Sequence, residues 1–359
     1  MNTITVIDAS ELTTKSFLNN YFYPRIPLVI KNLFTECEIN HIKTEDEAIK
    51  AFGHLEFECV EEYTSKFMQS NSFNQQPEKW SLRKYLEYIK KEKDTKLCIR
   101  EFTTPEQIIN LFTIPELIQF RKSSEITSNI FVANRNNFAH MHYDGDNRNV
   151  LLYQVFGRKR VTLISENYSS ALLPVLNQSW LNLSAYSERE KSLFIDMVQG
   201  YDFVLEPGDT LFFPMMAWHH LEYTDTGMSI NFRFGRNDYN KFLANFVHTD
   251  MYVQNISAKF NTQDSPSDYY DHIFNRIRDE VLVLDEDPIN KYLHMRKFMK
   301  SLHNEFCGSN FDNQYYLIPN DYLIDNNLSL LKIASRPYYF KNWSKAIGIS
   351  TAVNSLISN

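Results

Sequence analysis

Glycine is scarce in this chain, and the sequence lacks the tracts that mark fibrous or disordered proteins. Only 9 of the 359 residues are glycine, whereas 21 are tyrosine and 27 are phenylalanine. Disordered chains contain few aromatic residues, so this composition predicts a globular protein with a well-filled core. We find no internal repeat and no low-complexity tract in the sequence.

The sequence also lacks the patterns of zinc ribbons, secreted proteins and membrane proteins. Its cysteines form no Cys-x-x-Cys pair, which argues against a zinc ribbon or a thioredoxin-like motif, and scattered thiols suit a reducing compartment. The first residues contain no basic stretch followed by a long apolar one, as a signal peptide would. No apolar run approaches the roughly 18 residues of a membrane span. We therefore expect a cytoplasmic protein that does not cross a membrane. The cysteines are Cys37, Cys59, Cys98 and Cys307.

An excess of basic charge is missing too. The net charge is −7 and the isoelectric point is near 5.8. Nucleic-acid-binding domains usually carry a basic face, so the composition gives no support for a broad surface of that kind, although it is compatible with a local basic groove.

The first third of the chain predicts mixed α and β structure. Residues 1–35 have the pattern of a strand, a helix and a second strand. Residues 36–130 alternate short strands and helices, and we expect one of these helices within residues 104–122.

From about residue 129 to 236 the pattern changes to short apolar runs separated by tight turns. Residues 149–155 are apolar with little alternation, which predicts a strand buried on both faces. The polar turn Gly157–Arg160 between two such runs predicts a β-hairpin. Pro207-Gly208-Asp209 is typical of a turn, because proline presets φ and glycine accepts a positive φ. Many short strands with tight turns indicate a sandwich or a barrel.

After Gly235 helical spacing replaces the strand pattern. We divide the chain into a strand-rich domain with N-terminal α/β elements, residues 1–239, and a mainly helical C-terminal region, residues 240–359. The protein could form a homodimer through that region. The expected helices cover residues 238–262, 267–283, 287–305 and 326–334.

Two separated motifs contain the candidate functional residues. Residues i and i+2 of an extended strand face the same side, so His142 and Asp144 can reach one metal ion. A second histidine must then come from another strand, and His219-His220 supplies one. Neighbouring strand residues point to opposite faces, so these two histidines cannot easily bind the same ion. Two histidines and one carboxylate form the facial triad of non-haem Fe(II) sites, which leaves coordination positions open.

Several motifs in the order found here resemble those of the JmjC/cupin-8 hydroxylases. These are Fe(II)- and 2-oxoglutarate-dependent oxygenases related to the asparaginyl hydroxylase that acts on hypoxia-inducible factor. The resemblance spans about residues 138–236, residues 17–30 also look like the N-terminal strand region of the family, and the C-terminal third resembles no family. The motifs are His142-Tyr143-Asp144, Gln154–Arg160, Leu205–Pro214, Trp218-His219-His220 and Ser229–Phe232.

The resemblance implies a mainly β fold with flanking helices, built on a double-stranded β-helix of the jelly-roll or cupin type. It also implies an iron ion held by His142, Asp144 and His219, the histidine directly after Trp218. We expect His140, which faces the same way as His142, to contact the substrate or to support a ligand. Tyr143 and Trp218 are expected in the core.

The resemblance further implies three residues for binding the co-substrate. Lys159 should bind the distal carboxylate of 2-oxoglutarate, because a carboxylate entering a semi-buried pocket needs a cation. Asn231 and Asn149 should lie near the co-substrate. The loop at residues 145–149 is longer than usual in the family, so the choice among its asparagines stays open.

Two further positions depart from the family pattern. Ala139 replaces a threonine that binds 2-oxoglutarate in many relatives, and Arg233 replaces an aromatic residue of some relatives. Both departures concern the surroundings of the co-substrate, and the three iron ligands are unaffected.

The expected function is an Fe(II)-, 2-oxoglutarate- and O2-dependent dioxygenase that hydroxylates a side chain in a protein or peptide and releases succinate and CO2. Alternatives are a small-molecule hydroxylase acting on an amino acid or nucleoside, and a non-catalytic cupin-like metal-binding module. Demethylation would be the same reaction on an N-methyl group. A sugar isomerase or storage-type cupin would need a richer His/Glu ligand set. No motif identifies the substrate.

Overall fold

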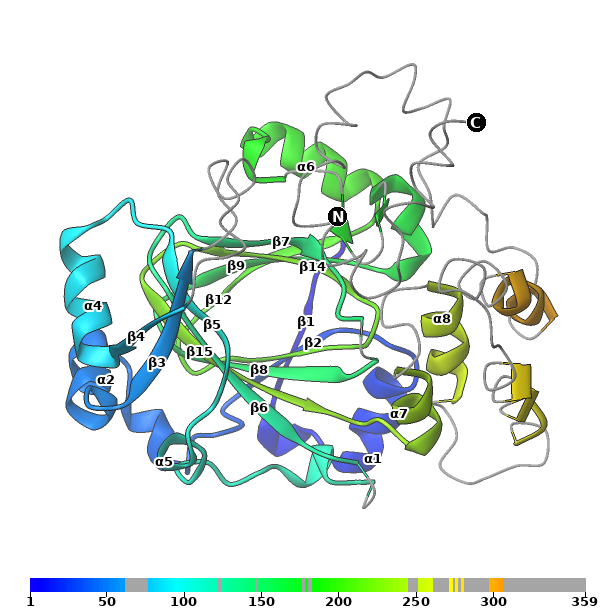
Figure 1. Ribbon diagram of the computed structural model, residues 1–359, viewed down its shortest axis with the longest axis horizontal. Coiled ribbons are helices and arrows are strands. Elements are labelled where there is room, and N and C mark those ends of the chain that lie inside the picture. The colour runs from blue at the N-terminus through cyan, green and yellow to red at the C-terminus, as the bar shows by residue number, and fades with distance from the viewer. Residues whose placement is uncertain are drawn as a thin grey trace.

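Two β-sheets face each other across a shared interior in the computed structural model (Figure 1). The model describes residues 1–61, 77–121, 124–145, 147–172, 174–175, 178–179, 183–244, 251–260, 271–273, 275–276, 279–280 and 297–305.

The larger sheet contains nine strands and the smaller sheet six. In spatial order the larger sheet runs β1 (Thr5–Asp8), β2 (Leu28–Lys31), β13 (Thr210–Phe213), β8 (Asn149–Phe156), β15 (Gly227–Phe234), β6 (Thr127–Ala133), β5 (Leu97–Thr103), β3 (Glu56–Glu61), β4 (Glu78–Ser81). The smaller sheet runs β10 (Pro174–Val175), β11 (Gln178–Ser179), β7 (Phe138–His142), β14 (Trp218–Tyr223), β9 (Lys159–Ile164), β12 (Tyr201–Leu205).

The eight strands of the barrel confirm the expected double-stranded β-helix. From β6 to β9 the chain changes sheet at every step, and it does so again from β12 to β15. The central strands β13, β8, β15 and β6 pair antiparallel in one sheet, and β7, β14, β9 and β12 do so in the other. This alternation gives a jelly roll whose interior is lined by both sheets.

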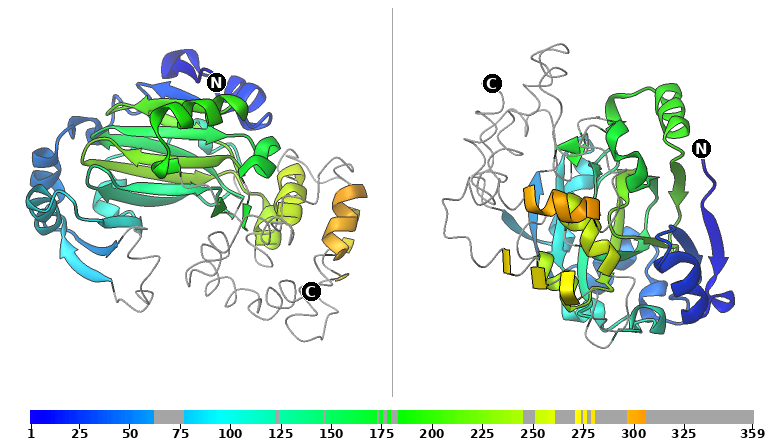
Figure 2. Two further views of the ribbon diagram at one scale, coloured as in Figure 1. Left: turned by 90° about the horizontal axis from the view of Figure 1, so that it is seen from above. Right: turned by 90° about the vertical axis from the view of Figure 1, so that its right-hand side faces the viewer.

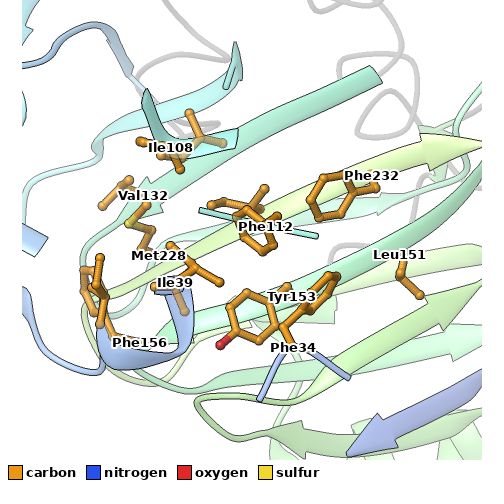
Figure 3. Packing of buried hydrophobic residues seen from close by; sticks show 14 of the residues in the cluster. Phe34, Ile39, Ile108, Phe112, Val132, Leu151, Tyr153, Phe156, Met228 and Phe232 are labelled. Atoms are coloured by element: carbon orange, nitrogen blue, oxygen red, sulfur yellow. The ribbon is translucent and has the colours of Figure 1, made fainter. Parts of the chain in front are cut away.

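Strand β8 is buried along its whole length, as its apolar sequence predicted. Val150 and Leu152 belong to a cluster with residues of the smaller sheet, inside the barrel. Alternate residues such as Tyr153 pack on the outer face of the larger sheet. There the ring of Phe112 meets Tyr153 and Phe232 edge-on, with centroids 5.7 and 5.1 Å apart (Figure 3).

The predicted hairpin at Gly157–Arg160 is wrong, because the strands on its two sides belong to different sheets. Strand β8 pairs with β13 and β15, whereas β9 pairs with β12 and β14. The chain turns this corner at Gly157, where φ is +67° and an added Cβ would lie 2.1 Å from the carbonyl oxygen of Thr226. An apolar–turn–apolar pattern is the same for a hairpin and for a corner between sheets.

The helices cover the outside of the barrel (Figures 1 and 2). Helix α6 (Glu188–Met197) lies over the outer face of the smaller sheet, where Lys191 Nζ is 2.7 Å from Glu222 Oε1 of β14. Helix α4 buries Leu82, Leu86 and Ile89 with the periodicity of one helical face. The labelled α-helices among the described residues are α1 (Thr14–Phe17), α2 (Glu45–Phe52), α4 (Leu82–Lys91), α5 (Glu106–Ile109), α6 (Glu188–Met197), α7 (Asp238–Ala244) and α8 (Met251–Phe260).

The helix expected within residues 104–122 is shorter than the pattern suggested. Among residues 104–121, which the structure describes, the helical segments are α5 and a 3-10 turn at Glu116–Ile118. Pro115 precedes that turn and has no N–H to donate, so it cannot continue a helix.

Helical residues after position 238 pack beside the smaller sheet. Ile256 and Phe260 of α8, and Leu302 further on, join a buried cluster that contains Tyr143 and Trp218. The predicted helix at residues 326–334 lies outside the described residues, and the division at residue 239 stays a prediction. None of the helices in the described part of the chain has the length and hydrophobicity that a membrane span requires.

We predict that Gly157→Ala lowers the free energy of unfolding by about 1–3 kcal/mol, because it adds backbone strain and a clash with a main-chain oxygen. Gly208→Ala is the matched control: φ is also positive there, at +92°, but the nearest atom to an added Cβ is the flexible Lys43 Nζ at 3.2 Å. Denaturant unfolding should show the larger loss for Gly157→Ala. Equal losses would mean that the close approach at the corner contributes nothing.

Candidate metal centre

Three side chains converge at one end of the barrel, as the sequence predicted. His142 is the last residue of β7, and it lies in register opposite His219 of β14. The Nε2 atoms of His142 and His219 lie 3.8 and 4.0 Å from Oδ1 of Asp144, and the ring centroids are 4.2 Å apart. Ligands about 2.1 Å from one ion lie about 3 Å from each other at right angles, so side-chain shifts of about 1 Å would bring all three onto a shared ion.

Hydrogen bonds to the main chain orient both imidazoles. His142 Nδ1 lies 2.6 Å from the carbonyl oxygen of His140, and His219 Nδ1 lies 3.0 Å from that of Ala217. A carbonyl oxygen can only accept, so each Nδ1 carries the hydrogen and each Nε2 presents a lone pair. The pKa of each histidine is lowered to about 4, chiefly by burial, and at His142 the neighbouring His219 contributes to the lowering. Two lone pairs and a carboxylate therefore point at one another, an arrangement that fits a bound cation.

Large buried side chains support the site from behind. The ring of Phe213 lies 4.8 Å from that of His219. Trp218 donates from Nε1 to Ser169 Oγ at 2.7 Å, and its ring meets Tyr143 edge-on at 4.9 Å. Trp218 and Tyr143 are fully buried, which confirms their predicted place in the core.

The two spare histidines have other contacts. His220 Nε2 lies 3.1 Å from Glu222 Oε1, under helix α6, and the group that could hold a metal ion contains His219 instead. His140 Nε2 lies 2.6 Å from the carbonyl oxygen of Ser179. The carbonyl oxygen of His140 that accepts from His142 belongs to the main chain, so the role of the His140 side chain stays a prediction.

Lys159 lies inside the barrel, on the same sheet as His219. Its side chain is 2% exposed, donates to Ser229 Oγ at 2.5 Å and lies 4.2 Å from the centre of the Tyr223 ring. Lys159 pairs with Tyr223 and Leu163 pairs with His219. Four residues of strand separate the two positions, which is about 13 Å.

Asn231 lies between Ser229 and Arg233 along β15, and strand alternation places all three side chains on the interior face. Asn231 is 6% exposed, and its Oδ1 has no hydrogen-bond partner within the described part of the chain. Leaving a buried polar atom unsatisfied costs about 1–3 kcal/mol. The amide, in either of its two orientations, is therefore available to a polar ligand.

The two asparagines that follow Asp144, Asn147 and Asn149, differ in their surroundings. Asn149 Oδ1 accepts a hydrogen bond from the backbone of Met215 at 3.1 Å, which ties down the loop that precedes His219. Its assignment to co-substrate binding stays a prediction. Asn147 is fully buried at φ +54°, and neither of its amide atoms has a partner among the described residues.

One residue beside the site, Glu101, was missed by the sequence analysis. Oε1 of Glu101, in β5, lies 2.8 Å from Nη2 of Arg233. The same nitrogen atom lies 3.9 Å from Oδ2 of Asp144. Arg233 was noted only as a departure from the family pattern. The available signal was the charged pair Arg100-Glu101 within an otherwise mostly apolar strand.

We predict that His219→Ala abolishes stoichiometric binding of a divalent metal, whereas His220→Ala retains it. The two residues are neighbours, but only His219 faces Asp144. Isothermal titration with Co(II) under nitrogen measures the difference. Retained binding in His219→Ala, or equal loss in both variants, would contradict the assignment of ligands.

Comparison with known proteins agrees with this geometry. Over 96 residues the chain is 31% identical to Jumonji C domain-containing protein 5 of Drosophila melanogaster, and the aligned part covers 26% of this chain and 23% of that relative. The chain thus matches less than a quarter of the length of that relative. Residues 14–240 match the family described as the Cupin-like domain. A jelly-roll barrel with a His-Asp-His group at one end, together with this match over most of the chain, shows that the protein belongs to the cupin-like JmjC family.

Proposed function

We propose that the protein is an Fe(II)- and 2-oxoglutarate-dependent oxygenase that hydroxylates a side chain in a protein or peptide. The observation that carries the proposal is the convergence of two imidazole lone pairs and one carboxylate at the end of the barrel. Two nitrogen ligands and one oxygen ligand on one side suit Fe(II) and leave the other side free for further ligands. Membership of the family supports the same chemistry.

The protein residues in this proposal bind, orient and exclude water. His142, Asp144 and His219 would hold the ion, which together with 2-oxoglutarate and O2 supplies the oxidising chemistry when bound. The main-chain carbonyls that accept from the two Nδ1 atoms fix both rings before the metal arrives. Because the imidazoles are neutral at neutral pH, they need not lose a proton to bind it.

Lys159 is our candidate for the distal carboxylate of 2-oxoglutarate. Its ammonium group is almost fully buried, and it shares the inner face of the smaller sheet with His219. A five-carbon dicarboxylate together with the long lysine side chain can bridge the strand distance between them. Ser229 orients the ammonium group, and the unsatisfied amide of Asn231 lies on the facing sheet. Val161, between these ends, and Leu163, which pairs with His219, would contact the methylene carbons.

A non-catalytic metal-binding module is the second candidate. Ala139 favours this candidate, because it offers no hydroxyl group to a co-substrate, whereas many relatives have a threonine at this position. A module of this kind would bind the metal without consuming 2-oxoglutarate, so turnover separates the two candidates.

The proposal predicts that the anaerobically reconstituted protein forms succinate from 2-oxoglutarate once O2 is admitted. A peptide library should contain products that are heavier by one oxygen, detected by mass spectrometry, and a metabolite library tests the small-molecule alternative in parallel. Asp144→Ala should reduce succinate formation to background. Metal binding without any succinate, with or without the libraries, would favour the non-catalytic module.

Lys159→Met should raise the KM for 2-oxoglutarate at least tenfold, because the co-substrate loses its cation while the metal ligands stay in place. Lys84→Met is the matched control: Lys84 Nζ also lies over an aromatic ring, 4.0 Å from Trp80, but on helix α4. Initial rates of succinate formation against co-substrate concentration give both values. An unchanged KM in Lys159→Met would remove this residue from the co-substrate site.

A further inference from the structure

A β-bulge lies beside the metal centre, in strand β5. Ile99 pairs with Val132 and Phe102 with Ile130, so two residues of β5 oppose Phe131 alone. One of these two is Glu101, whose φ is +51°. A positive φ at a non-glycine residue is strained, and such strain is often found at functional sites.

The bulge changes the direction of the Glu101 side chain. Ile99 and Phe102 pack on the outer, apolar face of the larger sheet. In a regular strand Glu101 would share the face of Ile99, but the extra residue turns it toward the barrel interior. Asn129 Nδ2 donates to the carbonyl oxygen of Glu101 at 3.0 Å and holds the bulge in place.

The redirected carboxylate meets Arg233, which in turn lies beside a metal ligand. One guanidinium nitrogen of Arg233 is 2.8 Å from Glu101 Oε1 and 3.9 Å from Asp144 Oδ2. The other oxygen of Asp144, Oδ1, is the one that faces the two imidazoles. The two oxygens of one carboxylate thus have different neighbours, the arginine on one side and the histidines on the other.

We propose that Arg233, held by Glu101, is a positioning residue that orients Asp144 to bind the metal through Oδ1 alone. A carboxylate that turned both oxygens onto the ion would occupy a coordination position that the co-substrate needs. Arg233 is 15% exposed and Asp144 16%, so their attraction is only partly screened. This inference rests on the proposed function, because it assumes that Asp144 binds a metal ion.

An electrostatic role and an orienting role of Arg233 predict opposite changes in metal affinity when this residue is replaced. Removing a cation beside a divalent ion strengthens metal binding by electrostatics alone. Loss of orientation weakens it, by about tenfold for a residue that supports a ligand. The double variant Glu101→Gln with Arg233→Gln removes one charge of each sign, so a purely electrostatic role predicts an affinity close to that of the wild type.

The test is a Co(II) titration of the full chain under nitrogen, followed by calorimetry and by the visible absorption of the bound ion, which reports its coordination. We expect about tenfold weaker binding and a changed spectrum for Arg233→Gln, and a similar loss for the double variant. Arg83→Gln is the matched control, because Arg83 and Glu87 form an exposed Arg–Glu pair on α4. Thermal unfolding without metal verifies that each variant is folded. If Arg233→Gln does not fold, Glu101→Ala provides the spectrum instead, because the side chain that it removes is half-exposed.

Each outcome decides the inference. Tighter binding by Arg233→Gln, wild-type affinity of the double variant, or a wild-type spectrum in Arg233→Gln or Glu101→Ala would overturn it and leave the proposed function intact. Failure of the wild-type protein to bind Co(II) would overturn both.

Discussion

The register between β7 and β14 is the constraint on which the rest of the site depends. It places His142 directly opposite His219, so the two imidazoles lie on the same face of the smaller sheet with ring centroids 4.2 Å apart. A slip of one residue would bring His220 to this face and send His219 under helix α6. The buried Trp218, which packs against Tyr143 behind the strands, holds the register, since a slip would move its side chain to the other face.

The interior of the barrel changes character along its length. Polar atoms converge around the histidines, and the buried ammonium group of Lys159 lies four strand residues away. Val161 lies between these positions, and Leu163 pairs with His219 itself. A ligand with a chelating end, a short carbon chain and a distal carboxylate matches this sequence of environments. The match supports the proposed co-substrate on physical grounds.

The ligands and the core of the fold were predictable because they depend on local rules. The i, i+2 spacing of His142 and Asp144 is visible in the sequence, although β7 ends at His142 and Asp144 follows it. Strand β8 was recognisable from its mostly apolar run. The corner at Gly157 was misread because the pattern of a strand does not say which sheet the strand joins. Glu101 could not be found, because its direction depends on a bulge defined by pairing with β6. The features that could not be predicted from the sequence are those that depend on contacts between distant segments.

A crystal structure of the protein grown under nitrogen with Co(II), with anomalous diffraction at the metal edge, tests the central claim most directly. The account predicts one strong peak about 2.1 Å from Nε2 of His142, Nε2 of His219 and Oδ1 of Asp144. A peak at other residues, or at Nδ1 atoms with rotated rings, would contradict it.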